Sequence, residues 1–254
     1  MLAEPLAGRA VLVTGASSGI GRAIAVAAAR AGADVAITYR ANSSGAEEVA
    51  REIQTTGRRV VVMRFDLTDD NAVDEIGSAV VGSLGRLDVW INNAGADILT
   101  GASASLSDRE KLNLLLAVDL RGTMLASWAA VQTLSAQKTG GVIINMSWDH
   151  VLTGMAGTNP QMYAAVKGGV LAFSKSLARS VAPRVRVNVL APGWIETTFG
   201  AGLDADRHRE VAESTPLKRW GTPDDVAGAA VFLASPAAAF MTGQTLLVGG
   251  GAVM

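Results

Sequence analysis

Short, almost continuous apolar runs alternate with segments of helical periodicity along nearly the whole chain. The runs predict strands at residues 10–14, 34–38, 59–65, 87–91, 141–146, 185–190 and 245–248. Helical patterns lie between them at residues 20–31, 45–56, 72–84, 109–135, 161–181 and 224–234. Unbroken apolar runs are typical of strands covered on both faces, and their alternation with helices predicts right-handed crossovers. We therefore expect an α/β fold, a doubly wound parallel sheet of about seven strands with helices on both faces.

One segment interrupts this alternation. Residues 200–215 are rich in charge and fit neither pattern, so we expect a mobile substrate-loop insert at about 194–215, near a ligand. No linker, repeat or low-complexity tract divides the 254 residues, and we expect residues 1–254 to form a single domain.

Composition and charge narrow the classes of function. The chain has no cysteine and two histidines, which argues against a disulfide framework, a thiol nucleophile and a metal site. A net charge of −1 without a basic stripe argues against nucleic acid and anionic membrane as partners. The first ten residues lack the apolar run of a secretory signal, and Ser235 and Pro236 interrupt the longest apolar stretch. We expect a soluble, cytoplasmic protein.

The first predicted strand leads into a glycine-rich turn that opens a helix. Residues 14–21 read Thr-Gly-Ala-Ser-Ser-Gly-Ile-Gly, with glycines at 15, 19 and 21. Such glycines allow a tight turn and a close approach of the backbone to a pyrophosphate at the helix N-terminus. The spacing differs from G-x-G-x-x-G, and a strand-to-helix turn with capping serines is the alternative. Its place in the first strand–helix unit favours a dinucleotide site of the Rossmann type.

Several motifs in the same order resemble those of the short-chain dehydrogenase/reductase family, in the branch of 3-oxoacyl-carrier-protein reductases and glucose dehydrogenases. Besides residues 14–21, they are Asp66, Asn-Asn-Ala-Gly at 92–95, Tyr-Ala-Ala-Val-Lys at 163–167, Pro-Gly at 192–193 with Thr197, Thr-Gly-Gln at 242–244 and Val-Gly-Gly at 248–250. The resemblance spans nearly the whole chain. It implies an oxidoreductase that interconverts a secondary alcohol and a ketone by hydride transfer to or from NAD(P). It also implies a homotetramer that pairs the helices containing Asp119 and Tyr163.

The resemblance further implies which residues hold the cofactor. They are Gly15, Ser17, Ser18, Gly19, Ile20 and Gly21 for the phosphates and ribose, Asp66 and Leu67 for the adenine, Asn93, Ala94 and Gly95 for the adenosine wall, and Pro192, Gly193, Ile195 and Thr197 with Tyr163 and Lys167 for the nicotinamide end.

The second strand ends without an acidic residue, and Arg40 offers a fork for a 2′-phosphate. A solvated arginine is the alternative for Arg40. NADP is therefore favoured, and use of NAD stays open.

Tyr163 and Lys167 are the candidate proton-transfer pair. Four residues apart on a predicted helix, they share one face. A phenol with a pKa of about 10 is a poor acid or base at neutral pH, and an adjacent ammonium draws that pKa downward. The resemblance assigns this pair to proton exchange with the substrate oxygen.

Two other positions depart from the family's catalytic tetrad. Trp148 stands where a second serine usually donates a hydrogen bond to the substrate oxygen, which leaves Ser147 as the candidate. Trp148 itself, His150 and Thr153 are alternative donors, with His150 either a proton carrier or a partly exposed loop residue. Asp119 replaces the family's asparagine. Its carboxylate would neutralise Lys167 and weaken the pull on the Tyr163 pKa, unless Arg121 pairs with it instead.

These departures keep a second class of function open, a cofactor-binding family member with weak or no catalysis and a regulatory or structural role. Substrate specificity is expected from residues 97–107, 149–162 and 194–215. These segments and Trp148 bring together Met155, Met162, Trp194 and Phe199, with Asp97, Asp149 and Glu196 nearby. A mostly apolar lining suits a hydrophobic carbonyl better than a phosphorylated sugar.

Overall fold

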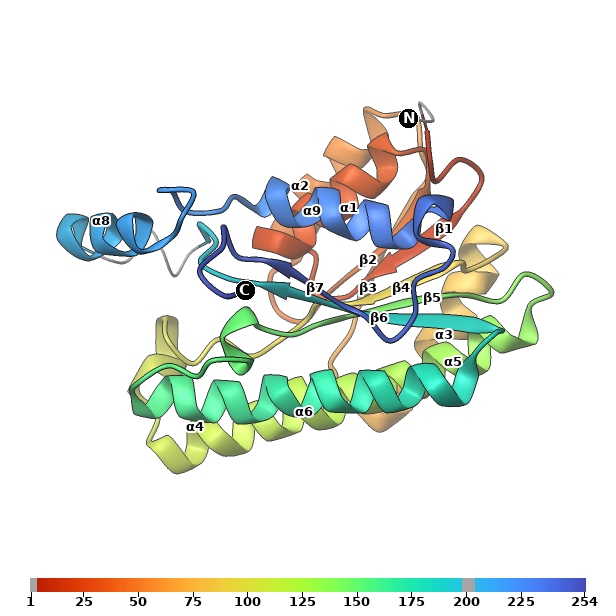
Figure 1. Cartoon of the computed structure of the whole chain (residues 1–254). Coiled ribbons are helices and arrows are strands. Elements are labelled where there is room, and N and C mark those ends of the chain that lie inside the picture. The colour runs from red at the N-terminus through yellow and green to blue at the C-terminus, as the bar shows by residue number, and fades with distance from the viewer. Residues whose placement is uncertain (1–3, 198–203) are drawn as a thin grey trace.

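Within residues 4–197 and 204–254, which the computed structural model describes, seven strands form one parallel sheet (Figure 1). In spatial order the strands are β3 (Val60–Arg64), β2 (Asp34–Tyr39), β1 (Ala10–Val13), β4 (Val89–Asn92), β5 (Gly141–Met146), β6 (Val185–Pro192) and β7 (Thr245–Val248). The order reverses between β1 and β4, the point at which doubly wound sheets open a crevice at their carboxyl ends. The expected doubly wound sheet is confirmed.

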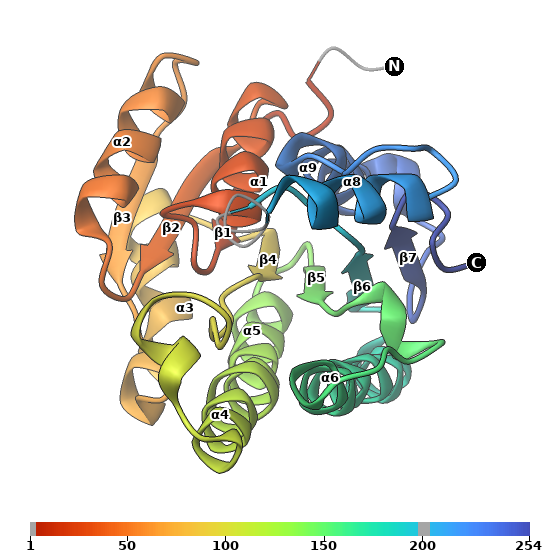
Figure 2. The same cartoon turned by 90° about the vertical axis from the view of Figure 1, so that its left-hand side faces the viewer.

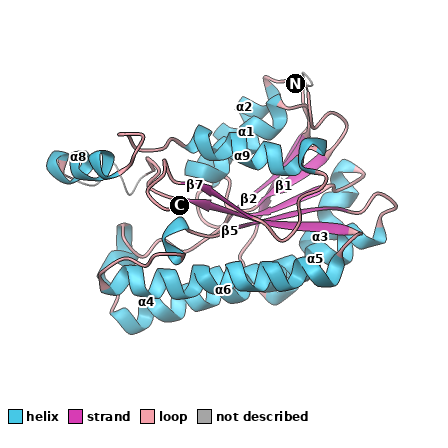
Figure 3. Ribbon diagram, viewed as in Figure 1, coloured by secondary structure: helices cyan, strands magenta, loops and turns pink. Residues whose placement is uncertain are grey.

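Helices cover both faces of the sheet (Figures 2 and 3). One layer contains α1 (Gly19–Arg30), α2 (Ser43–Gln54) and α9 (Pro223–Ala234), and the other contains α3 (Asp70–Leu84), α4 (Asp108–Leu115), α5 (Thr123–Ala136) and α6 (Thr158–Val181). Successive residues of β1 serve the two layers. Val11 and Val13 pack with the first, and Leu12 packs with the second. Burial on both faces explains why the strands read as unbroken apolar runs.

The predicted helix at 109–135 has an irregular centre. A π-helical segment, Leu116–Gly122, joins α4 to α5 and places Asp119 within the wider turn. Among the described residues, Asp108–Ala136 is the one helical stretch long and apolar enough to cross a membrane, by length and composition alone. Half of its most apolar 18-residue stretch is buried inside the protein, as expected of a core helix.

The charged segment expected as a mobile insert contains a further helix, α8 (Ala205–Ser214), which projects beyond the two layers (Figure 1). Asp204 caps it by accepting a hydrogen bond from the Arg207 N–H at 2.8 Å. Val211 is its single buried residue, so apolar periodicity could not reveal the helix. Residues 198–203 of the expected insert lie outside the described part of the chain.

Candidate active site

A cavity of ≈ 910 Å³ opens at the carboxyl ends of β1, β4, β5 and β6. Its wall includes Gly15 after β1, Ala94 after β4, Ser147 after β5 and Gly193 after β6. Every residue expected to bind the cofactor or to act in catalysis lies on this wall except Gly21. The fold therefore brings sequence-distant motifs to one crevice at the switch point of the sheet.

The glycine-rich turn forms a close-packed cradle at one end of this cavity. A Cβ added to Gly15 would lie 2.8 Å from the Cα of Ala94, and Gly15 has φ +65°. A Cβ on Gly21 would lie 2.4 Å from the Gly15 carbonyl oxygen, so Gly21 serves turn packing behind the wall. Ser18 occupies the N-cap of α1, but its side chain makes no capping hydrogen bond. The turn is thus not a serine-capped one, and its open backbone fits a phosphate group.

Arg40 and Asp66 mark the other side of the cradle. Arg40 is exposed directly after β2, lines the cavity and forms no salt bridge with any described residue. Asp66 accepts hydrogen bonds from the backbone N–H and the hydroxyl of Thr68, at 2.9 and 2.8 Å. Burial raises the pKa of Asp66. These hydrogen bonds and the charges of Arg40 and Arg64 lower it by more than burial raises it, so the net pKa lies below the usual range. An anion and a cation therefore line this end of the cavity, where the sequence predicts the adenosine of a cofactor.

Tyr163 and Lys167 stand on α6, with Asp119 facing them from the π-helical segment. The Lys167 ammonium lies 5.5 Å from the centre of the Tyr163 ring and 2.8 Å from Oδ1 of Asp119. Lys167 and Asp119 are both buried, and the second carboxylate oxygen accepts the Ala96 N–H at 2.8 Å. Arg121, the alternative partner of Asp119, pairs instead with Asp70 on the surface. Residues two positions apart on a helix face different directions, so Arg121 points away from Asp119.

Electrostatics in this group differ from the simple expectation for a tyrosine beside a lysine. Burial raises the pKa of Tyr163, the Lys167 charge lowers it and the Asp119 charge raises it, with a net pKa above the ordinary value. Burial alone would lower the pKa of Lys167, but Asp119 and Tyr163 outweigh burial and raise it. The expected weakening of the lysine's pull is therefore borne out in direction. Lys167 stays protonated, and Tyr163 is held as a neutral phenol at neutral pH.

Ser147 lines the cavity, but its hydroxyl faces the helix behind it. The hydroxyl donates to the Lys167 carbonyl at 2.8 Å, and Ser147 is 4% exposed. Trp148 occupies the wall beside Tyr163, with ring centres 5.4 Å apart at an interplanar angle of 63°. Trp148 therefore presents an aromatic ring to the cavity, while the neighbouring Ser147 bonds to the backbone.

Sequence reasoning missed the role of Asp149. Its side chain is fully buried, with Oδ1 2.6 Å from Nδ1 of His150 and Oδ2 unpartnered among the described residues. Burial raises the pKa of Asp149 above its usual range, although its bond to His150 opposes this. Cβ atoms on Gly193 and Gly249 would lie 2.4 and 2.2 Å from Oδ2, so two close backbone approaches surround the carboxyl group. Gly193 and Gly249 are the positions in the sequence that could have indicated this close packing around Asp149.

His150 is a partly exposed residue of the connection between β5 and α6, as the sequence favoured. Its side chain is 15% exposed and stacks on Trp148 with ring centres 4.9 Å apart. It contacts Trp194 edge-on at 5.9 Å, and Trp194 contacts Trp220 at 5.6 Å. Aromatic rings thus continue from Tyr163 toward α8.

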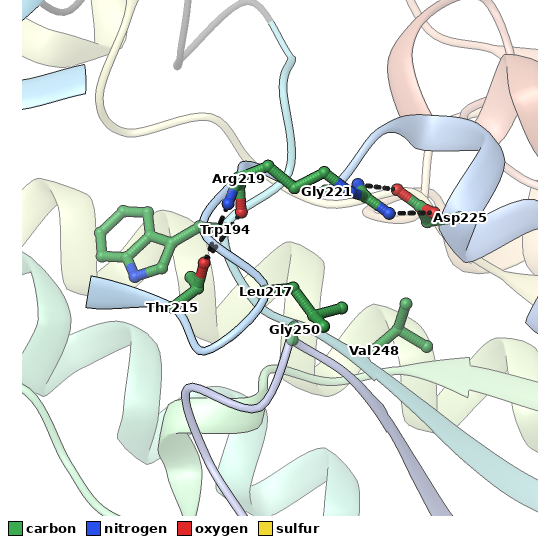
Figure 4. A pocket seen from close by; sticks show the side chains of 9 residues that line it. Trp194, Thr215, Leu217, Arg219, Gly221, Asp225, Val248 and Gly250 are labelled. Atoms are coloured by element: carbon green, nitrogen blue, oxygen red, sulfur yellow. Dashed lines mark hydrogen bonds and ion pairs between the residues drawn. The ribbon is translucent and has the colours of Figure 1, made fainter. Parts of the chain in front are cut away.

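Polar contacts between loop residues and the helices α8 and α9 hold the end of this aromatic series. Arg219 forms two hydrogen bonds with Asp225 at 2.7 and 3.0 Å beside a small cavity of ≈ 80 Å³ that Trp194 also lines (Figure 4). The Trp220 indole donates to the His208 carbonyl at 2.9 Å, and the His208 ring contacts Glu196 at 2.7 Å. The first contact ties α8 to Trp220 of the cavity wall, and the second ties it to the segment after β6.

The expected apolar substrate pocket is realised in part. Trp148, Met155 and Trp194 line the cavity, as does Asp97. Met162 instead packs in a buried cluster with Ile98, Leu115 and Val166. Phe199 lies outside the described residues.

Comparison with known proteins agrees with this geometry. A family profile described as enoyl-(acyl carrier protein) reductase matches residues 15–253. The chain is 36% identical over 254 residues to 3beta-hydroxysteroid dehydrogenase 1 of Eggerthella lenta, which covers 98% of this chain and 95% of that protein. It is 36% identical over 253 residues to a 3-oxoacyl-[acyl-carrier-protein] reductase of Synechocystis, with 98% of each chain covered. A short-chain dehydrogenase from Burkholderia cenocepacia, solved in complex with NADP, superposes with a TM-score of 0.86 at 33% identity, over 98% of this chain and 99% of that one.

Proposed function

Because the chain belongs to the short-chain dehydrogenase/reductase family of nicotinamide-dependent oxidoreductases, we propose that it is an NADP-dependent enzyme interconverting a secondary alcohol and a ketone. Residues 1–254 act as one catalytic domain in this proposal. The observation that carries it is the position of Tyr163, which stands on the cavity wall with Lys167 behind it. The glycine cradle and Arg40 line the same cavity, so cofactor and proton donor can meet there.

The site residues divide the chemistry between them. A nicotinamide ring, when bound, supplies the hydride in reduction or accepts it in oxidation. The Tyr163 hydroxyl donates a proton to the carbonyl oxygen in reduction and removes the hydroxyl proton in oxidation. Lys167 holds a positive charge beside the phenol, and Asp119 balances that charge in the buried site. Pro192, Gly193, Ile195 and Thr197 would hold the nicotinamide end against Tyr163.

One observation favours the second class of function, a cofactor-binding protein with weak or no catalysis. The Ser147 hydroxyl is engaged by the Lys167 carbonyl rather than directed to a substrate. Titration with NADPH and NADH, followed by turnover of a panel of apolar and cyclic ketones, separates the two. Tight NADPH binding with turnover supports the reductase. Tight binding with no turnover on the panel would support the binding protein.

Arg40 provides the test of cofactor choice. Arg40→Met is expected to weaken NADPH binding by about tenfold to a hundredfold, because a charge-assisted fork to the 2′-phosphate is lost. NADH lacks that phosphate, and its Kd should stay within about threefold of the unmodified protein's. Fluorescence titration measures both. Arg64→Met is the matched control, since Arg64 lies outside the cavity wall. Equal losses for the two cofactors would contradict the NADP preference.

A homotetramer follows from the same family premise. Large apolar side chains are exposed on two separate faces, with Trp128 47% exposed beside Phe173 on α5 and α6, and Phe240 fully exposed near β7. Light scattering on the purified protein is expected to give four times the chain mass. Trp128→Glu should lower this mass by splitting one interface, because a carboxylate is costly to bury against an apolar surface. A monomeric unmodified protein would contradict the expectation.

A further inference from the structure

The substrate's carbonyl oxygen needs a second hydrogen-bond donor besides Tyr163, because negative charge develops on that oxygen during reduction. Ser147 is the donor that sequence order suggests. Its single hydroxyl proton is committed to the Lys167 carbonyl at 2.8 Å, and the residue is 4% exposed. A hydroxyl has one proton to donate, so it cannot serve the helix and a substrate together. In this arrangement, a second donor comes from a different group on the wall.

Trp148 carries an unengaged donor on the cavity wall beside the Tyr163 ring. Its ring lies edge-on to Tyr163 with centres 5.4 Å apart, and it lines the cavity. The indole N–H makes no hydrogen bond with any residue in the described part of the chain, and it is not among the buried polar atoms. An indole N–H is a donor only, and it usually finds a partner. A ligand oxygen in the cavity would be such a partner.

The Trp148 ring is supported from behind. His150 stacks on it at 4.9 Å with an interplanar angle of 22°, and His150 is not part of the cavity wall. Asp149 holds Nδ1 of His150 at 2.6 Å and is itself enclosed by Gly193 and Gly249. The ends of β6 and β7 thus fix the carboxyl group, the carboxyl group fixes the imidazole, and the imidazole limits tilting of the indole. This preorganisation is what a donor to a developing oxyanion requires.

We propose that the indole N–H of Trp148 replaces the serine hydroxyl of the family as the second donor to the carbonyl oxygen, with Asp149 and His150 as its positioning residues. This inference rests on the proposed oxidoreductase function. In reduction, a bound nicotinamide would supply the hydride to the carbonyl carbon, and Tyr163 transfers its proton to the carbonyl oxygen. Trp148 keeps its proton throughout and stabilises the charge by a hydrogen bond.

The test compares three variants with a ketone that the unmodified enzyme reduces. Trp148→Phe keeps an aromatic ring but removes the N–H, and it is expected to lower kcat by about a hundredfold. Its Kd for NADPH should change by less than about threefold, and the loss should be the same across the pH range, because an indole N–H does not titrate there. Ser147→Ala is expected to lose less than about tenfold, since its hydroxyl is engaged elsewhere. Trp148→His restores a ring N–H and should recover part of the loss.

The outcomes separate this inference from the proposed function. An unmodified protein that binds NADPH and reduces none of the ketones would contradict the function itself. An active unmodified enzyme with an equally active Trp148→Phe variant would overturn the role of Trp148 alone. A hundredfold loss in Ser147→Ala would assign the donor to Ser147 and overturn the inference whatever happens at Trp148. If Trp148→Phe fails to bind NADPH, the Trp148→His variant is compared with Ser147→Ala instead. Trp148→His is expected to bind NADPH like the unmodified enzyme. Because it keeps a ring N–H, its turnover should fall by less than about tenfold.

Discussion

Replacing Tyr163 with phenylalanine is expected to lower turnover by about 10²–10⁴-fold, the usual contribution of a positioned general acid or base. The phenol is the titratable hydroxyl on the wall next to Lys167, and the ring itself packs against the buried cluster around Met162. Phenylalanine keeps that packing and removes the proton. The loss should therefore fall on kcat, in both directions of the reaction, and not on folding.

The control for this variant is its binding of NADPH. The cradle around Gly15 and the fork at Arg40 are untouched, so the Kd for NADPH should stay within about threefold of the unmodified value. Stopped-flow or steady-state kinetics with one ketone and its alcohol give the turnover numbers. A Tyr163→Phe enzyme that keeps its kcat would show that another group transfers the proton, and the proposed mechanism would fail.

The second large effect is expected at Asp119 and appears in the pH dependence. The pKa of Tyr163 lies above its ordinary value because of burial first and the Asp119 charge as a further contribution, against the charge of Lys167. Reduction needs the neutral phenol, which is present at every pH below that pKa. Oxidation needs the phenolate, whose fraction rises about tenfold for each pH unit below the pKa. The enzyme should therefore work best as a reductase near neutral pH and oxidise alcohols faster as the pH rises.

Asp119→Asn is expected to move the rise in oxidation rate to lower pH by about 1–3 units. The reason is that the Lys167 charge then acts on Tyr163 without a carboxylate 2.8 Å away to offset it. Loss of one partner of this buried pair should also lower the free energy of unfolding by about 3–5 kcal/mol, so folding is monitored by NADPH binding. Asp70→Asn is the matched control, because Asp70 pairs with Arg121 on the surface. An unchanged pH profile, or a shift to higher pH, would show that Asp119 does not contribute to the raised pKa of Tyr163.

Features that depend on neighbours in the chain were predicted from the sequence. The strand runs, the glycines of residues 14–21 and the i, i+4 spacing of Tyr163 and Lys167 all rest on local geometry or on burial of both sheet faces. For that reason the doubly wound sheet was confirmed, with the strand ends within a few residues. The chain order of the motifs also located the cavity, since the carboxyl ends of parallel strands share one edge of the sheet.

Contacts between distant segments were decided only by the tertiary structure. Whether Ser147 faces a substrate depends on the Lys167 carbonyl of α6, and the burial of Asp149 depends on Gly193 and Gly249 at the ends of two other strands. The helix α8 has one buried residue, so the apolar pattern of the sequence did not predict it. The direction of the Tyr163 pKa shift depends on burial and the Asp119 charge, which raise the pKa, and on the Lys167 charge, which lowers it. Local sequence determined the elements and the order of the motifs, whereas side-chain direction, desolvation and charge balance arose from packing between elements that are far apart in the chain.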